Sequence, residues 1–329
     1  MFSLLAGIFL SILLSLSLSF LNIWLNGWSW LIFFLLFLFS IIFGFNIDQF
    51  LKHWYRIRRR KRVLRIGILN DMGWESQNEE IKTYTNICPQ AWKKELEELG
   101  KGKKIDVKLI TCKEPLESYT VVINPYGEVY PEYELGELGT LRKILEYVRG
   151  GGLFVNIAGI PCYYAFSPLL KKRVDLAFRD SPYTYERVST NKGDLFIPAF
   201  KYPLFDSTPL AKELDLIIRG TEETPAFNWD LRPSENFKEI FPEIRGIKVH
   251  RVAIVEKNVK PVVEPRVYVN GPGIRKGSST PIFYLPYGNG GFLISLIFID
   301  QHPEDVQNKL KQAICKLILS YRQYAPKIQ

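Results

Sequence analysis

The sequence predicts an α/β protein in which a mostly parallel, doubly wound (flavodoxin-like) sheet with an insertion follows two N-terminal transmembrane helices. Two observations lead to this prediction. Residues 1–47 contain no charged side chain. From residue 63 onward, short continuous apolar runs alternate with amphipathic segments. Continuous apolar runs are typical of strands that are buried on both faces of a sheet.

The apolar N-terminal region, residues 1–50, predicts a transmembrane helical hairpin. The runs Phe2–Leu25 and Trp30–Ile47 are long enough, at about 1.5 Å of helical rise per residue, to cross a hydrocarbon core of roughly 30 Å. Asn26 and Gly27 lie between them and favour a tight turn. A secretory signal peptide is the alternative, but the charged n-region and the cleavage site that it needs are not evident.

Residues 51–62 form a basic segment beside the predicted membrane helices. It carries Lys52, Arg56, Arg58, Arg59, Arg60, Lys61 and Arg62. With Asp48, these give the first 62 residues a net charge of +6 out of +9 for the chain. The positive-inside rule therefore predicts a multi-pass protein of the cell membrane whose soluble domain is cytoplasmic. Because little positive charge remains elsewhere, we expect no nucleic-acid binding and interpret the segment as a contact for anionic lipids; a topology signal alone is the alternative.

Small side chains recur every four residues in the first predicted span. Gly7, Ser11, Ser15 and Ser19 share one helix face, and such a stripe lets helices approach closely. The stripe is explained either by packing of the two spans within one chain or by assembly of a homo-oligomer or membrane complex.

Residues 63–329 predict one α/β domain. Its first half contains strands at 64–69, 107–111, 120–124 and 153–157 and helices at 92–99 and 140–148. An insertion without a sustained period covers about residues 174–250, before strands at 249–255, 266–269, 282–285 and 292–299 and a closing helix at 303–321. This order favours a parallel sheet covered on both faces.

The four cysteines are widely spaced, form no C-x-x-C pair, and occur in a chain with only three histidines. We therefore expect no structural metal site and no disulfide framework. No motif indicates a cofactor.

Polar residues follow several predicted strands, at the sheet edge where open parallel sheets bind ligands. Asp71 follows the first strand, and Asn124, Tyr126, Gly127 and Glu128 follow the third. We predict that these residues converge on one crevice and bind a polar ligand there.

Three further stretches carry a family resemblance. They are His302-Pro303-Glu304 after the last strand and the glycine-rich turns at 150–152 and 287–291. With these marks, residues 64–322 resemble the class I glutamine amidotransferase-like superfamily, including its trehalose-utilisation and β-galactosidase-associated branches. The resemblance implies a cysteine nucleophile on a strand-to-helix elbow, paired with a histidine and a glutamate, and a backbone oxyanion donor at Gly127.

The chain departs from that pattern at the elbow. Ala158 occupies the position that matches the nucleophile, and Cys162 comes four residues later among bulky neighbours. A catalytic triad of Cys162, His302 and Glu304 is one interpretation. The others are a buried small cysteine and a histidine that packs or caps a helix ahead of Pro303.

Three functional hypotheses follow. The first is a membrane-anchored, amidotransferase-like domain without glutaminase activity that acts in ligand binding or membrane-complex assembly. The second is an active membrane-tethered hydrolase or amidotransferase that uses Cys162. The third is a carbohydrate-related domain outside the cytoplasm, which requires the opposite topology.

Overall fold

A seven-stranded sheet organises this computed structural model, which describes residues 63–72, 88–134, 137–168, 172–175, 185–190, 193–198, 208–220, 229–255, 258–267 and 278–323. Residues Val63–Gln329 form one compact unit. The predicted hairpin and basic segment lie outside the described residues. Among the helices that are described, none is both long enough and apolar enough to cross a bilayer.

The strands of the sheet lie in the order β14-β17-β18-β5-β3-β1-β2. Their bounds are β1 Leu64–Leu69, β2 Ile105–Ile110, β3 Val121–Asn124, β5 Leu153–Asn156, β14 Lys260–Pro261, β17 Ile282–Tyr287 and β18 Gly290–Ser295. The pairs from β2 to β18 are parallel, whereas β17 and β14 add antiparallel strands at one edge. Counted along the chain, the parallel strands lie in the order 2-1-3-4-5, so the winding direction switches between β1 and β3.

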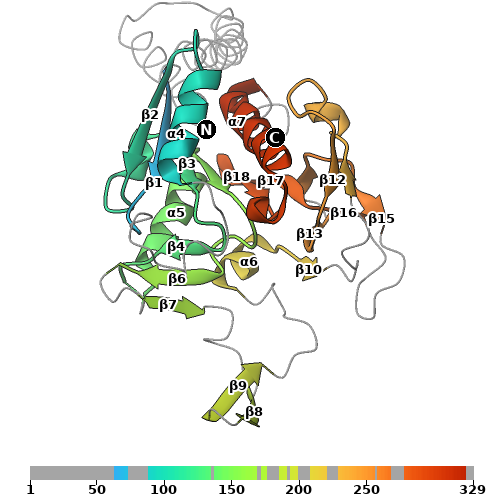
Figure 1. Cartoon of the computed structure of the whole chain (residues 1–329). Helices are drawn as coiled ribbons and strands as arrows, with labels where there is room; N and C mark the ends of the chain where they lie inside the picture. Colours follow the sequence, from blue (N-terminus) through green and yellow to red (C-terminus); the bar gives the residue numbers. More distant parts are fainter. Residues whose placement is uncertain are drawn as a thin grey trace, which may run out of the picture. The chain divides into compact units, whose positions relative to one another are not determined.

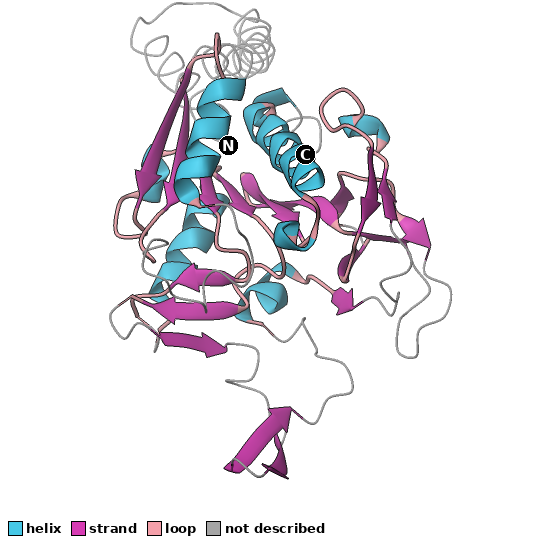
Figure 2. Ribbon diagram, viewed as in Figure 1, coloured by secondary structure: helices cyan, strands magenta, loops and turns pink. Residues whose placement is uncertain are grey.

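Helices cover both faces of the sheet (Figure 2). Helices α4 (Pro89–Leu99) and α7 (Glu304–Leu319) pack side by side on one face, and α5 (Gly139–Arg149) and α6 (Pro209–Leu214) lie on the other (Figure 1). In β3, Val121 and Ile123 join the first core while Val122 joins the second. This alternation explains the continuous apolar runs, because both faces are buried. The predicted α/β class and large parallel sheet are confirmed.

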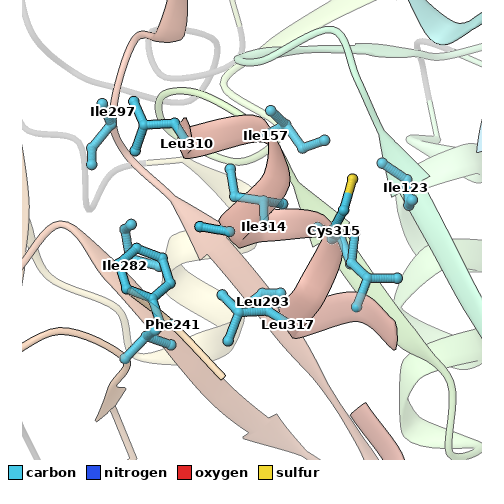
Figure 3. Packing of buried hydrophobic residues seen from close by; sticks show 14 of the residues in the cluster. Ile123, Ile157, Phe241, Ile282, Leu293, Ile297, Leu310, Ile314, Cys315 and Leu317 are labelled. Atoms are coloured by element: carbon cyan, nitrogen blue, oxygen red, sulfur yellow. The ribbon is translucent and has the colours of Figure 1, made fainter. Parts of the chain in front are cut away.

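The core beneath α7 is a continuous apolar layer (Figure 3). Leu310, Ile314 and Leu317 project from α7 toward the sheet, where they meet strand residues such as Leu293. Cys315 belongs to the same layer and is fully buried. It therefore serves as a small apolar side chain.

The glycine-rich turns have a packing role at the edge where the parallel strands begin. A Cβ atom on Gly290 would lie 2.1 Å from the Gly152 carbonyl oxygen, and one on Gly152 would lie equally close to the Tyr147 ring. Gly291 donates a backbone hydrogen bond to the same carbonyl at 3.2 Å. Only glycine permits this approach of the two turns.

The chain between β5 and β17, which includes the predicted insertion, forms mostly small antiparallel units. Its described strands are β6 Tyr164–Ser167, β7 Lys172–Asp175, β8 Tyr185–Thr190, β9 Gly193–Pro198, β10 Ile218–Gly220, β11 Trp229–Leu231, β12 Ile244–Ile247, β13 Arg251–Ile254, β15 Arg266–Val267 and β16 Ser278–Thr280. β6 also pairs in parallel with β4 (Val129–Pro131), which follows β3.

Candidate ligand site at the carboxyl edge of the sheet

The polar residues predicted to bind a ligand lie at the end of β3 and in the turns after β1 and β3, but they have different surroundings. Asn124, Tyr126 and Glu128 are at most 1% exposed, whereas Asp71 is partly exposed. The partners of each side chain show which of them is engaged inside the protein.

Asn124 holds two turns together. Its amide nitrogen donates to Asn156 Oδ1 at 2.9 Å and to the Val129 carbonyl at 2.9 Å, with a longer contact of 3.3 Å to the Gly127 carbonyl. Asn156 is the paired residue on β5, and its own amide donates to the Gly159 carbonyl at 3.3 Å. Both asparagines therefore have structural roles.

Glu128 is a buried carboxylate with internal partners. Its Oε1 accepts a hydrogen bond from the Ile160 backbone at 3.0 Å and forms an ion pair with Arg251 of β13. A Cβ atom at Gly159 would lie 2.4 Å from Glu128 Cγ, so the turn after β5 has room for this side chain only because that residue is glycine. The Arg251 guanidinium also lies 5.1 Å from the Phe298 ring centre. Glu128, which follows β3, thus connects its own turn with the turn after β5 and with strand β13.

Glu132 is a second buried carboxylate, which the sequence analysis did not single out. Its oxygens accept hydrogen bonds from the backbone of Thr140 at 2.9 Å, Leu141 at 3.2 Å and Glu134 at 3.0 Å, and from the Tyr130 hydroxyl at 3.1 Å. Two of these donors are in the first turn of α5, where a helix favours a negative charge. The Glu132 carboxylate therefore caps the N-terminus of α5 and interacts favourably with the helix dipole.

Only one of the two carboxylate oxygens of Asp71 has hydrogen-bond partners in the described part of the chain. Its Oδ2 accepts from the Cys112 backbone at 2.8 Å and from the Tyr133 hydroxyl at 3.3 Å. Its Oδ1 is buried and has no hydrogen-bond partner in the described part of the chain. Burial raises the pKa of the Asp71 carboxyl, and the bonds from Cys112 and Tyr133 offset part of that rise. A buried acceptor without a donor is costly and uncommon in a folded protein.

The surroundings of Asp71 come from three turns at the switch between β1 and β3. Lys113, after β2, lies with its ammonium 4.7 Å from the Tyr133 ring centre. Lys143 of α5 donates to the carbonyls of Cys112 and Glu114 at 2.7 and 2.6 Å, which fixes the turn after β2. Burial and the Asp71 charge raise the pKa of Tyr126 and of Tyr133, so both hydroxyls stay protonated at neutral pH.

Cys162 lies in packed core. It is 0% exposed and belongs to the apolar cluster on the α5 side of the sheet. Burial, with a smaller effect of Glu132, raises the pKa of its thiol far above the ordinary value. A reactive cysteine needs the opposite shift and an accessible sulfur.

The turn after β5 differs from a nucleophile elbow. Ala158 and Gly159 have positive φ angles of 69° and 75°, but the chain continues through turns into β6, with no helix at residues 157–163. An elbow needs a strand-to-helix turn that leaves the nucleophile exposed. Ala158 is fully buried and carries no nucleophilic atom.

His302 is engaged by backbone groups. Its Nε2 accepts from the Lys248 backbone at 2.9 Å, so its Nδ1 carries the proton and donates to the Phe298 carbonyl at 2.9 Å. Burial lowers the pKa of this imidazole. Glu304 is exposed in the first turn of α7, where an acid is favoured. No hydrogen bond joins His302 to Cys162 or Glu304 among the described contacts. The triad stays a prediction that this geometry does not favour.

Metal ligands are not assembled in the described residues, since no three His, Cys, Asp or Glu side chains are placed to share an ion. The groups around Asp71 are one carboxylate oxygen without a partner among these residues, the Tyr133 hydroxyl and the Lys113 ammonium.

Comparisons with known proteins do not place the chain in a family. No model of a known family and no curated protein matches it. Similar solved structures include a β-galactosidase from Bacillus circulans sp. alkalophilus, with 10% identity over 78% of this chain and 31% of the other and a TM-score of 0.44. A β-galactosidase from Rahnella sp. R3 has 14% identity over 78% and 31%, with a TM-score of 0.41. A ThuA-like protein from Parabacteroides merdae has 14% identity over 80% and 90%, with a TM-score of 0.35. The chain spans less than a third of the length of those β-galactosidases.

The family assignment drawn from the sequence is therefore corrected. Solved structures that resemble the chain include β-galactosidases and a ThuA-like protein, at low identity, and no family model supports the class I glutamine amidotransferase-like assignment. The motifs behind it have local physical explanations. The glycines let two turns pack, and His302 bonds to backbone groups.

Proposed function

We propose that this protein is a membrane-anchored α/β domain that binds a polar small molecule at the carboxyl edge of its sheet, between β1 and β3, without thiol-dependent catalysis. One observation carries the proposal. Asp71 Oδ1 is buried, lacks a donor in the described part of the chain, and lies at the switch of the doubly wound strand order. Open α/β sheets bind ligands at this position.

The chemistry of Asp71 restricts the ligand to a hydrogen-bond donor. A hydroxyl or ammonium group could supply the missing partner of Oδ1, while Cys112 and Tyr133 already hold Oδ2. The other polar groups of this edge are used internally, as shown by Asn124 and Glu128. The proposed contact therefore consists of Asp71 with Tyr133 and Lys113 beside it.

Membrane anchorage is the second part of the proposal, and it rests on the sequence. The uncharged run of residues 1–47 supports a transmembrane hairpin, and the basic segment that follows supports a cytoplasmic domain and contact with anionic lipids. Assembly through the small-residue face at Gly7 and Ser11 stays a prediction.

The test compares Asp71→Asn with Asp300→Asn in the full chain in mild detergent. Asp300 is a matched control because its Oδ1 is also buried without a partner in the described residues, but it follows β18. Thermal unfolding is measured with a panel of polyols and primary amines that includes glucose, glycerol and putrescine. We expect at least one probe to raise the melting temperature of the natural protein and of Asp300→Asn but not of Asp71→Asn. Equal responses in all three proteins would exclude Asp71 as the anchor.

A further inference from the structure

The edge of the sheet opposite the Asp71 site carries a basic turn. Lys101, Lys103 and Lys104 lie between α4 and β2 and are all exposed. None of the three forms an ion pair with another described residue. Gly102 has a φ of +81° with nothing within 4 Å of its Cβ position, so the turn needs glycine for its backbone and projects away from the core.

This turn lies beside the first residues of the folded domain. β1 and β2 lie side by side (Figure 1). Leu64 pairs with Ile105, and the Leu64 backbone donates to the Lys104 carbonyl at 2.8 Å. On the other side, the Arg322 guanidinium donates to the Val63 carbonyl at 3.1 Å. The chain therefore enters the domain between basic side chains.

The segment before Val63 indicates that the partner of the lysine turn is a lipid membrane. It follows an uncharged run of 47 residues and carries seven basic residues. Its 12 residues, 51–62, span at most roughly 40 Å when fully extended. A lysine turn at this place lies within reach of the headgroups that an anchored chain faces, and clustered Lys and Arg beside a membrane anchor recognise anionic lipids.

We propose that the turn at Lys101, Lys103 and Lys104 is a docking surface for anionic phospholipid, which holds the domain with the start of its strands toward the bilayer and the Asp71 edge away from it. This inference rests on the membrane anchor of the proposed function and adds to it a lipid contact made by the folded domain. Each lysine near an anionic surface contributes about a fivefold gain in association, so the three together contribute roughly a hundredfold.

Lysine footprinting of the full chain in nanodiscs tests the inference. One sample contains phosphatidylcholine alone, and the other contains phosphatidylcholine with 30% phosphatidylserine. Acetylation by a water-soluble ester is followed at each lysine by mass spectrometry. The matched control is Lys113, which is exposed at the other end of β2, roughly 20 Å along the strand.

We expect phosphatidylserine to slow acetylation of Lys101, Lys103 and Lys104 at least threefold, to leave Lys113 unchanged, and to lose this effect in 0.5 M NaCl because salt screens surface charge. Equal acetylation rates in the two nanodiscs would contradict the docking surface without contradicting the membrane anchor. Failure of the chain to enter nanodiscs at all would overturn the anchor itself and the docking surface with it. A uniform slowing that includes Lys113 would show general surface attraction and also contradict the proposed orientation.

Discussion

Glu132 and Asp71 are both carboxylates that directly follow strands, Glu132 after β4 and Asp71 after β1, yet their surroundings differ sharply. Glu132 is fully buried and accepts four hydrogen bonds from its own chain. Asp71 keeps one oxygen buried and without a partner in the described residues. Burial alone therefore does not identify a functional acid. What separates the two is whether the fold supplies every donor.

Removal of the Glu132 side chain gives the largest expected effect. In Glu132→Ala, the donors of Thr140, Leu141 and Tyr130 lose their acceptor. Since each buried donor left without a partner costs about 1–3 kcal/mol, we expect the free energy of unfolding to fall by about 4 kcal/mol in urea denaturation followed by tryptophan fluorescence. Glu137→Ala, an exposed neighbour, is the control. A loss below about 1 kcal/mol would show that the bonds contribute little.

The Glu128 and Arg251 pair extends the comparison to an ionic contact. Glu128 is 1% exposed and Arg251 is 21% exposed. Glu128→Gln leaves a partly buried guanidinium without its counter-ion, which is expected to lower the free energy of unfolding by about 3 kcal/mol. In the double variant Glu128→Gln/Arg251→Met, the loss should be smaller than the sum of the single losses. Additive losses would contradict a direct interaction.

His302 is expected to make the free energy of unfolding depend on pH, with an effect of intermediate size. Its pKa is lowered in the folded state, so the unfolded chain binds a proton first as the pH falls. The stability contribution of the neutral ring is present above about pH 6.5 and is lost below it, with a slope of at most about 1.4 kcal/mol per pH unit. Denaturation at pH 5.5 and 7.5 measures this loss. We expect His302→Gln to show a smaller difference between the two pH values, and an unchanged difference would place the titrating group elsewhere.

Asp71→Asn gives the smallest effect and has the opposite sign. Burial raises the pKa of Asp71, so its ionised form is destabilising at neutral pH. The neutral amide removes that penalty, and we expect the free energy of unfolding at pH 7 to rise by about 1 kcal/mol. A fall of similar size would mean that Asp71 is satisfied and structural, which would erase its contrast with Glu132.

The sequence predicts the parallel core well because its signal is local. β1, β3 and β5 are mostly apolar and almost fully buried, and their predicted bounds agree with the structure within one residue. The contacts at the carboxyl edge are harder to predict because the residues that pair there are distant in the chain. Nothing near Glu128 indicates that Arg251 of β13 neutralises it. Glu132 lies seven residues before α5, too far ahead to be read as a helix cap.

The contact between Arg322 and Val63 joins the two ends of the folded domain. During translation, β5, the middle strand of the sheet, is complete at Asn156, but its neighbour β18 begins only at Gly290. The predicted hairpin would by then have reached the membrane. One side of β5 therefore lacks its partner strand until the end of the chain is nearly made. This order of synthesis favours a folding intermediate with an exposed strand edge, which is prone to aggregation.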